Sequence, residues 1–194
     1  MCGISAVLAF DDSSRAAAAR DVLRMHAAVP HRGPDGEGFA TAGCDLVGRA
    51  HGDERSLLGA PPARAALAFR WLIVQDPSPA ALQPIASADG TKWLVFNGEI
   101  YNFVELREEL GRDGFVFRSQ SDAEVLLAAY EKWGTACFAR FNGMWAVVIV
   151  DLERRQAVLS RDRFGIRPLF YAERNGRIDV ASEIKQLLKV APTV

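Results

Sequence analysis

The chain has 194 residues, 49% hydrophobic and 24% charged, with a formal net charge of −1. This is one large domain or at most two small ones, with enough apolar residues for a core that needs neither a disulfide nor a structural metal. The near-zero charge gives no reason to expect a nucleic acid or an anionic membrane as a partner.

The first half of the chain alternates strands and helices with loops. Apolar runs predict buried strands, apolar residues at helical spacing behind a polar cap predict helices, and glycine and proline mark loops. The expected elements are a strand at 3–10, a helix capped by Asp11, Asp12 and Ser13 and stopped by Pro30, a loop at 31–38, a surface insertion at 43–66, strands at 69–74 and 92–96, and a loop at 76–79 between them.

The second half begins with two helices and ends in several strands. Asn102, three residues before Glu105, can cap one helix, and Ser121 with Glu124 forms a capping-box pattern that opens the next, which Gly134 ends. The remaining elements are strands at 144–150, 157–160, 169–172 and 178–181 and a final helix capped by Ser182. Antiparallel strands with helices able to cover them imply a layered α+β domain.

The three cysteines, Cys2, Cys44 and Cys137, are far apart and lie in no CxxC or Cys/His cluster typical of zinc. Their number and spacing suit a reducing compartment, with at least one free thiol to explain. The apolar start of the chain has no basic leader, so it does not resemble a signal peptide, and no apolar run approaches the roughly 20 residues that span a bilayer. We therefore expect a cytoplasmic protein without a membrane partner.

The second residue offers a nucleophile and a base together. Removal of Met1, which requires a small residue next, would leave Cys2 with a thiol and a free α-amino group. The ordinary pKa of such an amine is about 7.7–8.0 and that of a thiol about 8.5, so the amine can accept the thiol proton directly or through a water. Position alone favours a plainer interpretation, a small buried hydrophobe at a strand start.

Three further segments favour the catalytic interpretation. They are HRGPD at 31–35, NGEIYN at 97–102 and RDRFGIRPL at 161–169. Together with Cys2-Gly3-Ile4, they resemble the class II (N-terminal nucleophile) glutamine amidotransferases, and most closely the glutaminase half of glutamine-dependent asparagine synthetases. The match extends from Cys2 to about Leu188, and segments 121–124, 141–144 and 181–185 also fit the family in order.

The resemblance implies the roles of individual residues. Asn97, by its side-chain amide, and Gly98, by its backbone N–H, match the family's oxyanion hole. Arg70 matches the arginine that pairs with the substrate's α-carboxylate, for which a guanidinium fork is well suited. Glu99 and Asp122 match the acidic residues near the substrate's α-amino group. Backbone contacts to the substrate are implied for Trp71, Leu72, Ile73 and Val74.

Other motif residues are interpreted as scaffold. His31 and Arg32 lie in a loop that the family keeps near the nucleophile, and the arginines of 161–169 are expected to tie a loop to neighbouring carboxylates rather than to form an anion site. The strand that carries Asn97 and Gly98 is expected to end there in a sharp turn. His26, His31 and His51 show no metal-ligand spacing.

The implied fold is a four-layer α/β/β/α sandwich, with two antiparallel sheets face to face and helices outside. The implied reaction is hydrolysis of L-glutamine to glutamate and ammonia through a Cys2 thioester, with ammonia passed to a synthetase domain or subunit, most often for asparagine formation. We expect one glutaminase domain at residues 2–194, without a cofactor. ATP and Mg would belong to a separate synthetase domain, whose Ser-Gly-Gly motif is missing from this sequence.

Two departures from the family pattern and several alternatives stay open. The stretch from Gly38 to Arg70 is longer than the family usually has, and Gln75-Asp76 stands where Asp usually follows Ile-Val. The chain is either free-standing or an excised piece, and a homodimer is one option. The alternative functions are a binding or regulatory domain of the same shape, an N-terminal-nucleophile hydrolase for another amide, and an interaction subunit that activates a separate synthetase.

Overall fold

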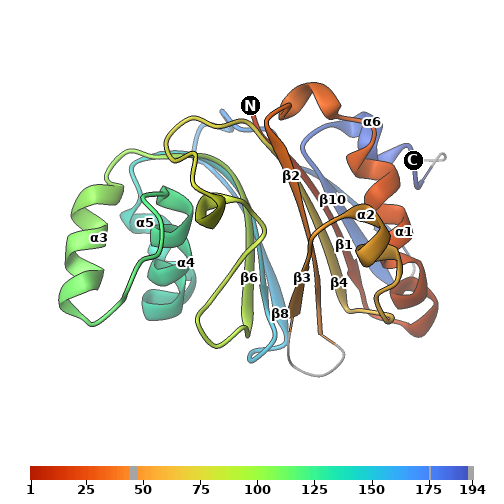
Figure 1. Cartoon of the computed structure of the whole chain (residues 1–194), viewed down its shortest axis with the longest axis horizontal. Helices are drawn as coiled ribbons and strands as arrows, with labels where there is room; N and C mark the ends of the chain where they lie inside the picture. Colours follow the sequence, from red (N-terminus) through yellow and green to blue (C-terminus); the bar gives the residue numbers. More distant parts are fainter. Residues whose placement is uncertain (44–47, 175, 192–194) are drawn as a thin grey trace.

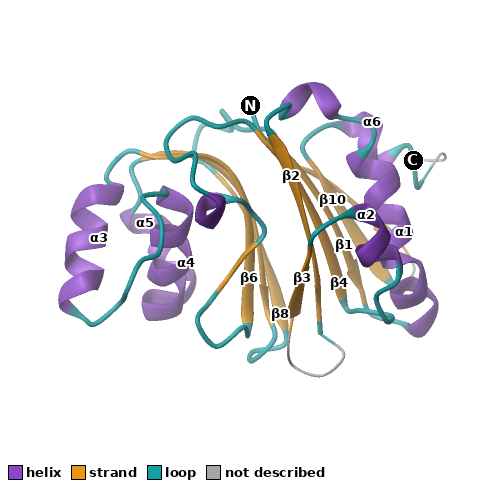
Figure 2. Ribbon diagram, in the orientation of Figure 1, coloured by secondary structure: helices purple, strands orange, loops and turns teal. Residues whose placement is uncertain are grey.

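The computed structural model describes residues 1–43, 48–174 and 176–191, which form four layers (Figure 1, Figure 2). Two antiparallel sheets face each other, and helices cover the outer face of each. The α+β class and the four-layer sandwich are therefore confirmed. Apolar side chains fill three interfaces: one between the sheets and one between each sheet and its helices.

The larger sheet has six strands in the order β3-β2-β4-β1-β10-β9. Helices α1, α2 and α6 lie on its outer face, to the right in Figure 1. The strands are β1 (Gly3–Ala9), β2 (Gly36–Ala42), β3 (Gly48–His51), β4 (Ala65–Trp71), β9 (Phe170–Arg174) and β10 (Arg177–Ala181). The helices are α1 (Asp12–His26), α2 (Glu54–Leu58) and α6 (Ile184–Leu187).

The smaller sheet has four strands in the order β5-β6-β7-β8, with three helices on its outer face. The strands are β5 (Ile85–Ala86), β6 (Lys92–Ile100), β7 (Gly143–Asp151) and β8 (Gln156–Arg161). The helices are α3 (Phe103–Arg112), α4 (Asp122–Trp133) and α5 (Cys137–Arg140). Because β5 pairs only with Leu94 and Trp93, most of the outer edge of β6 has no strand beside it.

Strand β1 shows why apolar and polar residues do not alternate along the buried strands of this chain. Ile4, Ala6 and Leu8 face the other sheet, whereas Val7 faces the helices. Both faces are covered, so the strand is a continuous apolar run. The same reasoning accounts for β7, which was predicted at 144–150 and is observed at Gly143–Asp151.

The helix ends agree with the sequence at some caps and differ at others. Asp11 caps α1 by accepting a hydrogen bond from Ser14 N at 2.7 Å, and Gly134 ends α4 with φ 58°. Ser121 caps α4, but Glu124 accepts from the loop residue Ser119 instead of completing a capping box.

Two predicted caps are wrong because their side chains have distant partners. Asn102 bonds the backbone at Arg140 and Asn142 and makes no helix-capping bond, and Ser182 accepts from Ile4 N, which leaves Glu183 to cap α6. Local sequence patterns do not reveal such long-range bonds.

The interpretation of 43–66 as a surface insertion agrees with the exposure of most of its described side chains, but it is wrong in that the segment carries regular elements of the fold. It contains β3, α2 and the start of β4, while residues 44–47 lie outside the described residues. Leu57 of α2 is fully buried, and a Cβ on Gly48 would lie 1.9 Å from Nε1 of Trp93 in the other sheet. These elements are too short to show a periodicity, so the sequence did not identify them.

Two strand boundaries and one connection also differ from prediction. The strand expected at 69–74 is Ala65–Trp71, and residues 36–38, expected in a loop, begin β2. The four strands at the end of the chain follow one another at hairpin spacing, but β8 and β9 lie in different sheets. The connection between them therefore crosses from one sheet to the other near the amino terminus.

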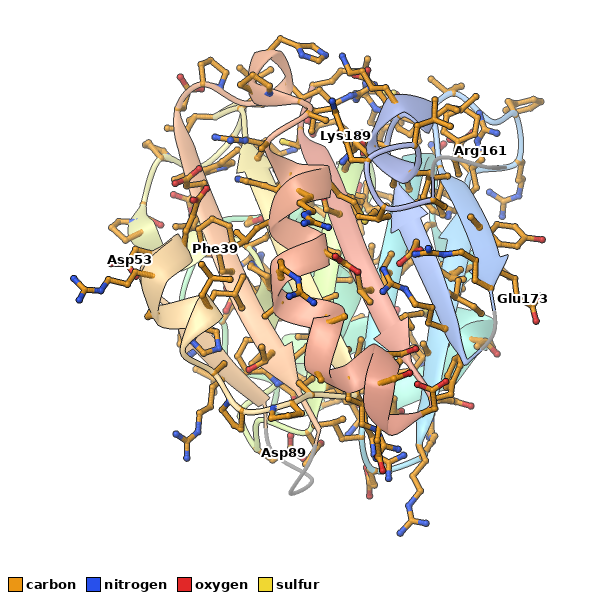
Figure 3. All side chains as sticks on the ribbon, turned by 90° about the vertical axis from the view of Figure 1, so that its right-hand side faces the viewer. Phe39, Asp53, Asp89, Arg161, Glu173 and Lys189 are labelled. Atoms are coloured by element: carbon orange, nitrogen blue, oxygen red, sulfur yellow. The ribbon has the colours of Figure 1, made fainter. Side chains whose placement is uncertain are left out.

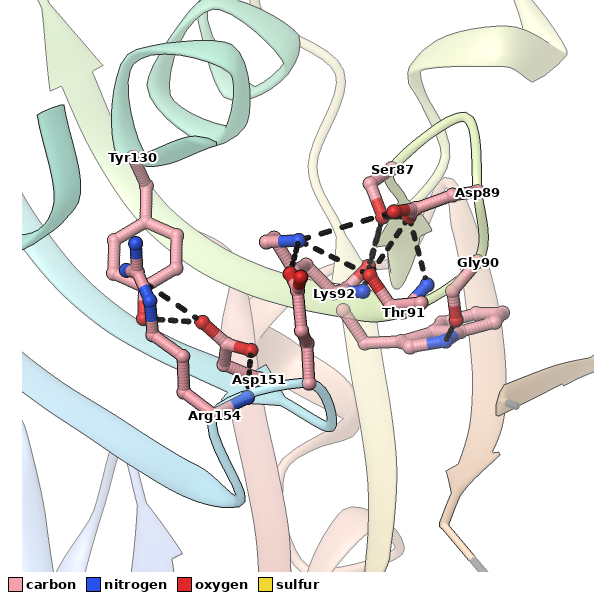
Figure 4. A network of polar contacts seen from close by, with 10 residues as sticks. Ser87, Asp89, Gly90, Thr91, Lys92, Tyr130, Asp151 and Arg154 are labelled. Atoms are coloured by element: carbon pink, nitrogen blue, oxygen red, sulfur yellow. Dashed lines mark hydrogen bonds and ion pairs between the residues drawn. The ribbon is translucent and has the colours of Figure 1, made fainter. Parts of the chain in front are cut away.

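A polar network closes the end of the smaller sheet where β6 begins (Figure 4). Lys92 donates to Glu153 at 2.9 Å, and Ser87 donates to Asp89 at 2.6 Å. Beside them Tyr130 donates its hydroxyl hydrogen to the fully buried Asp151 at 2.9 Å. This end of β6 is thereby fixed, while the chemistry-bearing residues lie at the other end. Within the described residues, no helix is long and apolar enough to cross a membrane.

Replacing Leu57 by alanine tests whether α2 belongs to the core. Leu57 is 0% exposed, whereas its neighbour Leu58 is 55% exposed. We expect Leu57→Ala to lower the free energy of unfolding by about 2–5 kcal/mol and Leu58→Ala by about 0.5 kcal/mol or less, measured by denaturant unfolding. Equal small effects would show that this segment is a dispensable insertion.

Candidate active site

Cys2 lies immediately before β1, next to the amino terminus marked in Figure 1. Its side chain packs against the core between the sheets, together with Trp71. The sulfur accepts a hydrogen bond from Leu72 N at 3.4 Å and donates to Leu72 O at 3.6 Å. The backbone that leaves β4 therefore holds the thiol in place.

A small cavity of about 50 Å³ adjoins this thiol. Seven of the residues that the sequence singled out line it: Cys2, Trp71, Leu72, Val74, Gly98, Glu99 and Asp122. Arg70, Ile73 and Asn97 do not line it. The structure thus brings most of the predicted site together from β1, β4, β6 and the start of α4.

Asn97 and Gly98 lie inside β6, so the predicted turn at this pair is wrong. They pair with Ala146 and Trp145 of β7. Gly98 is required by packing, because a Cβ there would lie 2.1 Å from Met144 O and 2.8 Å from Trp145 Cα. Asn97 is 2% exposed and its amide nitrogen Nδ2 has no hydrogen-bond partner among the described residues. A buried unpaired donor is costly and calls for an explanation.

The open edge of β6 directs one backbone N–H toward the cavity. Along a strand, alternate N–H groups point to the same edge. Phe96 N points to the open edge and donates to Gln83 Oε1 at 2.5 Å, and Ile100 N does so to Asp122 Oδ2 at 2.8 Å. Gly98 N, midway between them, therefore also points to this edge, where Gly98 lines the cavity.

Two carboxyl groups on the cavity wall have raised pKa values. Burial raises the pKa of Asp122 to about 7, with the nearby charge of Glu99 adding to the effect and the bond from Ile100 N opposing it. Burial also raises the pKa of Glu99, against the positive charge of Arg167 and a bond from Gln75 Nε2 at 2.5 Å. A cationic group entering the cavity would meet two acids whose ionised forms lack a full counter-charge.

Arg70 starts on the opposite face of the sheet from Cys2. Side chains alternate along β4, so Arg70 shares the helix-covered face with Ala66 and Ala68. Its Nη1 donates to Glu37 Oε2 at 2.7 Å. The predicted carboxylate-binding arginine is therefore bonded to a carboxylate of the protein itself.

The HRGPD segment holds the backbone around the thiol. Arg32 donates from Nη1 to Cys2 O at 3.2 Å and from Nε to Glu183 Oε1 at 2.5 Å, and His31 bonds the same Glu183 oxygen at 2.8 Å. Asp35 accepts from Ile73 N at 2.9 Å, which fixes the segment after β4. These contacts agree with the scaffold interpretation of His31 and Arg32.

The environment of the thiol disfavours its ionised form. Burial raises the pKa of Cys2, while the bond from Leu72 N, the positive chain terminus and Arg167 lower it and Glu99 raises it. Activation therefore needs a base. Met1 is 51% exposed at the surface, and while it is attached the Cys2 nitrogen belongs to a peptide bond and cannot serve as that base.

The segment 161–169 is organised differently from the prediction. Arg161 and Arg163 donate to backbone carbonyls, not to carboxylates, and Asp162 accepts from the backbone N–H groups of Phe164, Ile166 and Arg167 at 2.9–3.1 Å. The loop carries Arg167, whose positive charge lowers the pKa of Cys2 and of Glu99, and whose buried Nε has no hydrogen-bond partner in the described part of the chain.

Arg167 and Gln75 are site residues that the sequence reasoning missed. The three arginines of the segment 161–169 were a usable signal for Arg167, and the Gln75-Asp76 departure was one for Gln75. Among residues 1–43, 48–174 and 176–191, no group of three or more His, Cys, Asp or Glu could hold a metal ion.

Comparisons with known proteins place these features in a family. The family model described as a glutamine amidotransferase domain matches residues 50–194. Asparagine synthetase [glutamine-hydrolyzing] 1 of Bacillus subtilis is 34% identical over 189 residues, which are 97% of this chain and 27% of that protein. A putative asparagine synthetase [glutamine-hydrolyzing] of Mycobacterium tuberculosis is 36% identical over 199 residues, 100% of this chain and 29% of that protein. The chain thus spans less than a third of the length of these relatives.

A solved structure shares the fold. Glutamine phosphoribosylpyrophosphate amidotransferase from B. subtilis, complexed with ADP and GMP, superposes with a TM-score of 0.78 at 20% sequence identity. The match covers 98% of this chain and 44% of that one. At this identity the likeness concerns the fold alone.

Stability between pH 4 and 7 tests the environment of Asp122. Its pKa is raised from 3.8 to about 7, so between these values the folded protein holds a proton that the unfolded chain has released. This retained proton stabilises the folded protein relative to the unfolded chain at low pH, and that stabilisation is lost as pH rises toward 7. Relative to Asp122→Asn, the unaltered protein should lose up to about 1.4 kcal/mol of unfolding free energy per pH unit.

Denaturant unfolding at a series of pH values measures this difference, with the exposed Asp12→Asn as the control variant. Parallel pH profiles for the unaltered protein and Asp122→Asn would contradict the raised pKa.

Proposed function

The chain belongs to the glutamine amidotransferase domain family, and on this premise we propose that it hydrolyses the side-chain amide of L-glutamine through a thioester on Cys2. The observation that carries the proposal is the Cys2 thiol beside a cavity whose wall also presents Gly98 N–H, Glu99 and Asp122. A thiol, a donor for an oxyanion and acids for an ammonium group are the parts that such a reaction needs.

The first chemical step requires the processed amino terminus. After removal of Met1, the α-amino group of Cys2 takes the thiol proton and the sulfur attacks the carboxamide carbon of glutamine. The carbonyl oxygen becomes negative and accepts hydrogen bonds from Gly98 N–H and Asn97 Nδ2. Asn97 Nδ2 has no hydrogen-bond partner among the described residues, and Gly98 N points to the edge of β6 that faces the cavity, so both are oriented to serve the oxyanion.

The second half of the reaction releases two products. The protonated amino group gives its proton to the departing nitrogen as the C–N bond breaks, and ammonia leaves a γ-glutamyl thioester on Cys2. Water then attacks the thioester carbon, and the amine accepts a proton from that water. The C–S bond breaks, the protonated amine returns this proton to the sulfur, and glutamate leaves with the thiol restored.

The cavity wall and the neighbouring Arg70 supply contacts for the amino-acid head group. Ionised Asp122 and Glu99 pair with the α-ammonium group, which compensates the burial that raises their pKa values. Arg70 pairs with the α-carboxylate, and the backbone of residues 71–74 adds hydrogen bonds.

The ammonia acceptor is proposed from the relatives and the surface. Because those relatives are named glutamine-hydrolysing asparagine synthetases, we propose that ammonia passes to a synthetase domain or subunit for asparagine formation. Val74 at the cavity, and Phe164 and Ile166 in the loop that carries Arg167, are large exposed apolar side chains that such a partner could cover. We assign ATP and Mg to the synthetase reaction and no cofactor to glutamine hydrolysis.

Replacing Cys2 tests the nucleophile. With processed protein, Cys2→Ala should abolish glutamate release from glutamine, because no other group at the cavity can form the thioester. Cys137→Ala is the matched control, since that thiol is fully buried and burial raises its pKa to about 12. Glutamate is measured by a coupled assay. Turnover that survives in Cys2→Ala, or no turnover in processed unaltered protein, would contradict the proposal and favour a binding or regulatory domain.

Replacing Asn97 by alanine tests the oxyanion hole. The variant should lower kcat about 10²- to 10³-fold, because it removes one donor to the developing charge. KM for glutamine should change little, since the carbonyl oxygen is only weakly charged in the ground state. A loss confined to KM would assign Asn97 to substrate binding instead.

A further inference from the structure

Glu37 and Arg70 are cross-strand neighbours on the helix-covered face of the six-stranded sheet. The β2–β4 register places them directly opposite each other, so their side chains share one face. Arg70 Nη1 donates to Glu37 Oε2 at 2.7 Å. The guanidinium is thereby held beside β2, and Arg70 does not line the cavity next to Cys2.

The buried His26 forms a second hydrogen bond to the carboxylate of Glu37. His26 Nε2 lies 3.1 Å from the same Oε2 of Glu37, and because an ionised carboxylate only accepts, Nε2 carries the proton. The ring is 0% exposed and meets Phe39 edge-on at 5.0 Å between centroids; Figure 3 labels Phe39 on this face of the sheet. Burial lowers the pKa of His26 to about 4, so the ring contributes a hydrogen bond without a charge.

The bond between Glu37 and Arg70 can be displaced. A single oxygen of Glu37 accepts from two donors. Arg70 Nε is buried and, across residues 1–43, 48–174 and 176–191, has no partner, so the guanidinium fork is not used in full. The two side chains are 18% and 40% exposed, and partly exposed pairs contribute little. A ligand carboxylate that offers both oxygens could form the stronger bidentate pair.

We propose that Glu37 is a resident carboxylate that occupies Arg70 until the α-carboxylate of the substrate displaces it. Glu37 then sets the affinity for glutamine and acts as a specificity-determining residue. A ligand without a free carboxylate, such as a glutamine side chain within a peptide, cannot replace the ion pair that it would have to break. This inference rests on the role proposed above for Arg70.

Equilibrium binding separates this role from catalysis. In a Cys2→Ala background, which cannot consume the ligand, isothermal titration calorimetry compares L-glutamine with 4-aminobutanamide, the same amide without the α-carboxylate. Glu37→Gln should lower the Kd for glutamine about two- to five-fold and leave that for 4-aminobutanamide unchanged. In an Arg70→Gln background the same change should have no effect.

Two variants control for charge and folding. Glu173→Gln removes an exposed carboxylate on β9, the far edge strand of the same sheet (Figure 3), and should leave the Kd for glutamine unchanged. Glu37→Ser removes the contact without an isosteric amide and should tighten glutamine binding in the same direction. Thermal unfolding reports whether each variant is folded.

The outcomes distinguish this inference from the proposed reaction. Weaker or unchanged glutamine binding in both folded Glu37 variants, or tightening that persists without Arg70, would overturn the inference. Tighter binding without glutamate release from processed Cys2 protein would contradict the thioester mechanism and support the role of Glu37. No glutamine binding by any variant would overturn both.

Discussion

The hydrogen bonds that hold β1 between β4 and β10 fix the position of the thiol, and the rest of the site depends on them. Gly3 pairs with Arg70, so the strand remains in register up to the residue after Cys2. Ser182 and Gln186 bond both backbone groups of Ile4, and Arg32 bonds the Cys2 carbonyl. The amino terminus, normally a frayed part of a chain, is thereby held like a core residue.

The short pairing of β5 supplies the second part of the site. Because β5 leaves β6 early, the open edge of β6 is available to side chains and to the cavity. Gln83 and Asp122 take the N–H groups of Phe96 and Ile100, and Gly98 lies between them. The open edge of β6, to which another strand could pair, thus provides Gly98 N–H as an oriented backbone donor.

The sequence predicted the layers and most of the residues around Cys2, but not every contact between them. Long apolar runs and strong caps identified β1, β7, α1 and α4, whereas the single buried Leu57 of a five-residue helix leaves no periodic signal. The roles of Asn97, Gly98, Glu99 and Asp122 stay predictions, although three of these four residues line one cavity.

The sequence did not reveal which groups the charged side chains bond. Glu37 is an ordinary acidic residue until the β2–β4 register sets it opposite Arg70. In the sequence Arg167 cannot be distinguished from Arg161 and Arg163. In the structure, Asp162 accepts hydrogen bonds from the backbone of Ile166 and Arg167, which sets the shape of the loop. For Glu37 the deciding partner is 33 residues away in the sequence, and for Arg167 it is the folded shape of its own loop; neither is visible as a sequence pattern.

Intact-mass spectrometry before and after treatment with an electrophilic glutamine analogue tests the central claim most directly. We expect a chain that has lost Met1 and gains a single adduct, which peptide mapping places on the sulfur of Cys2. Retention of Met1 together with glutamine turnover, or labelling at another residue, would contradict it.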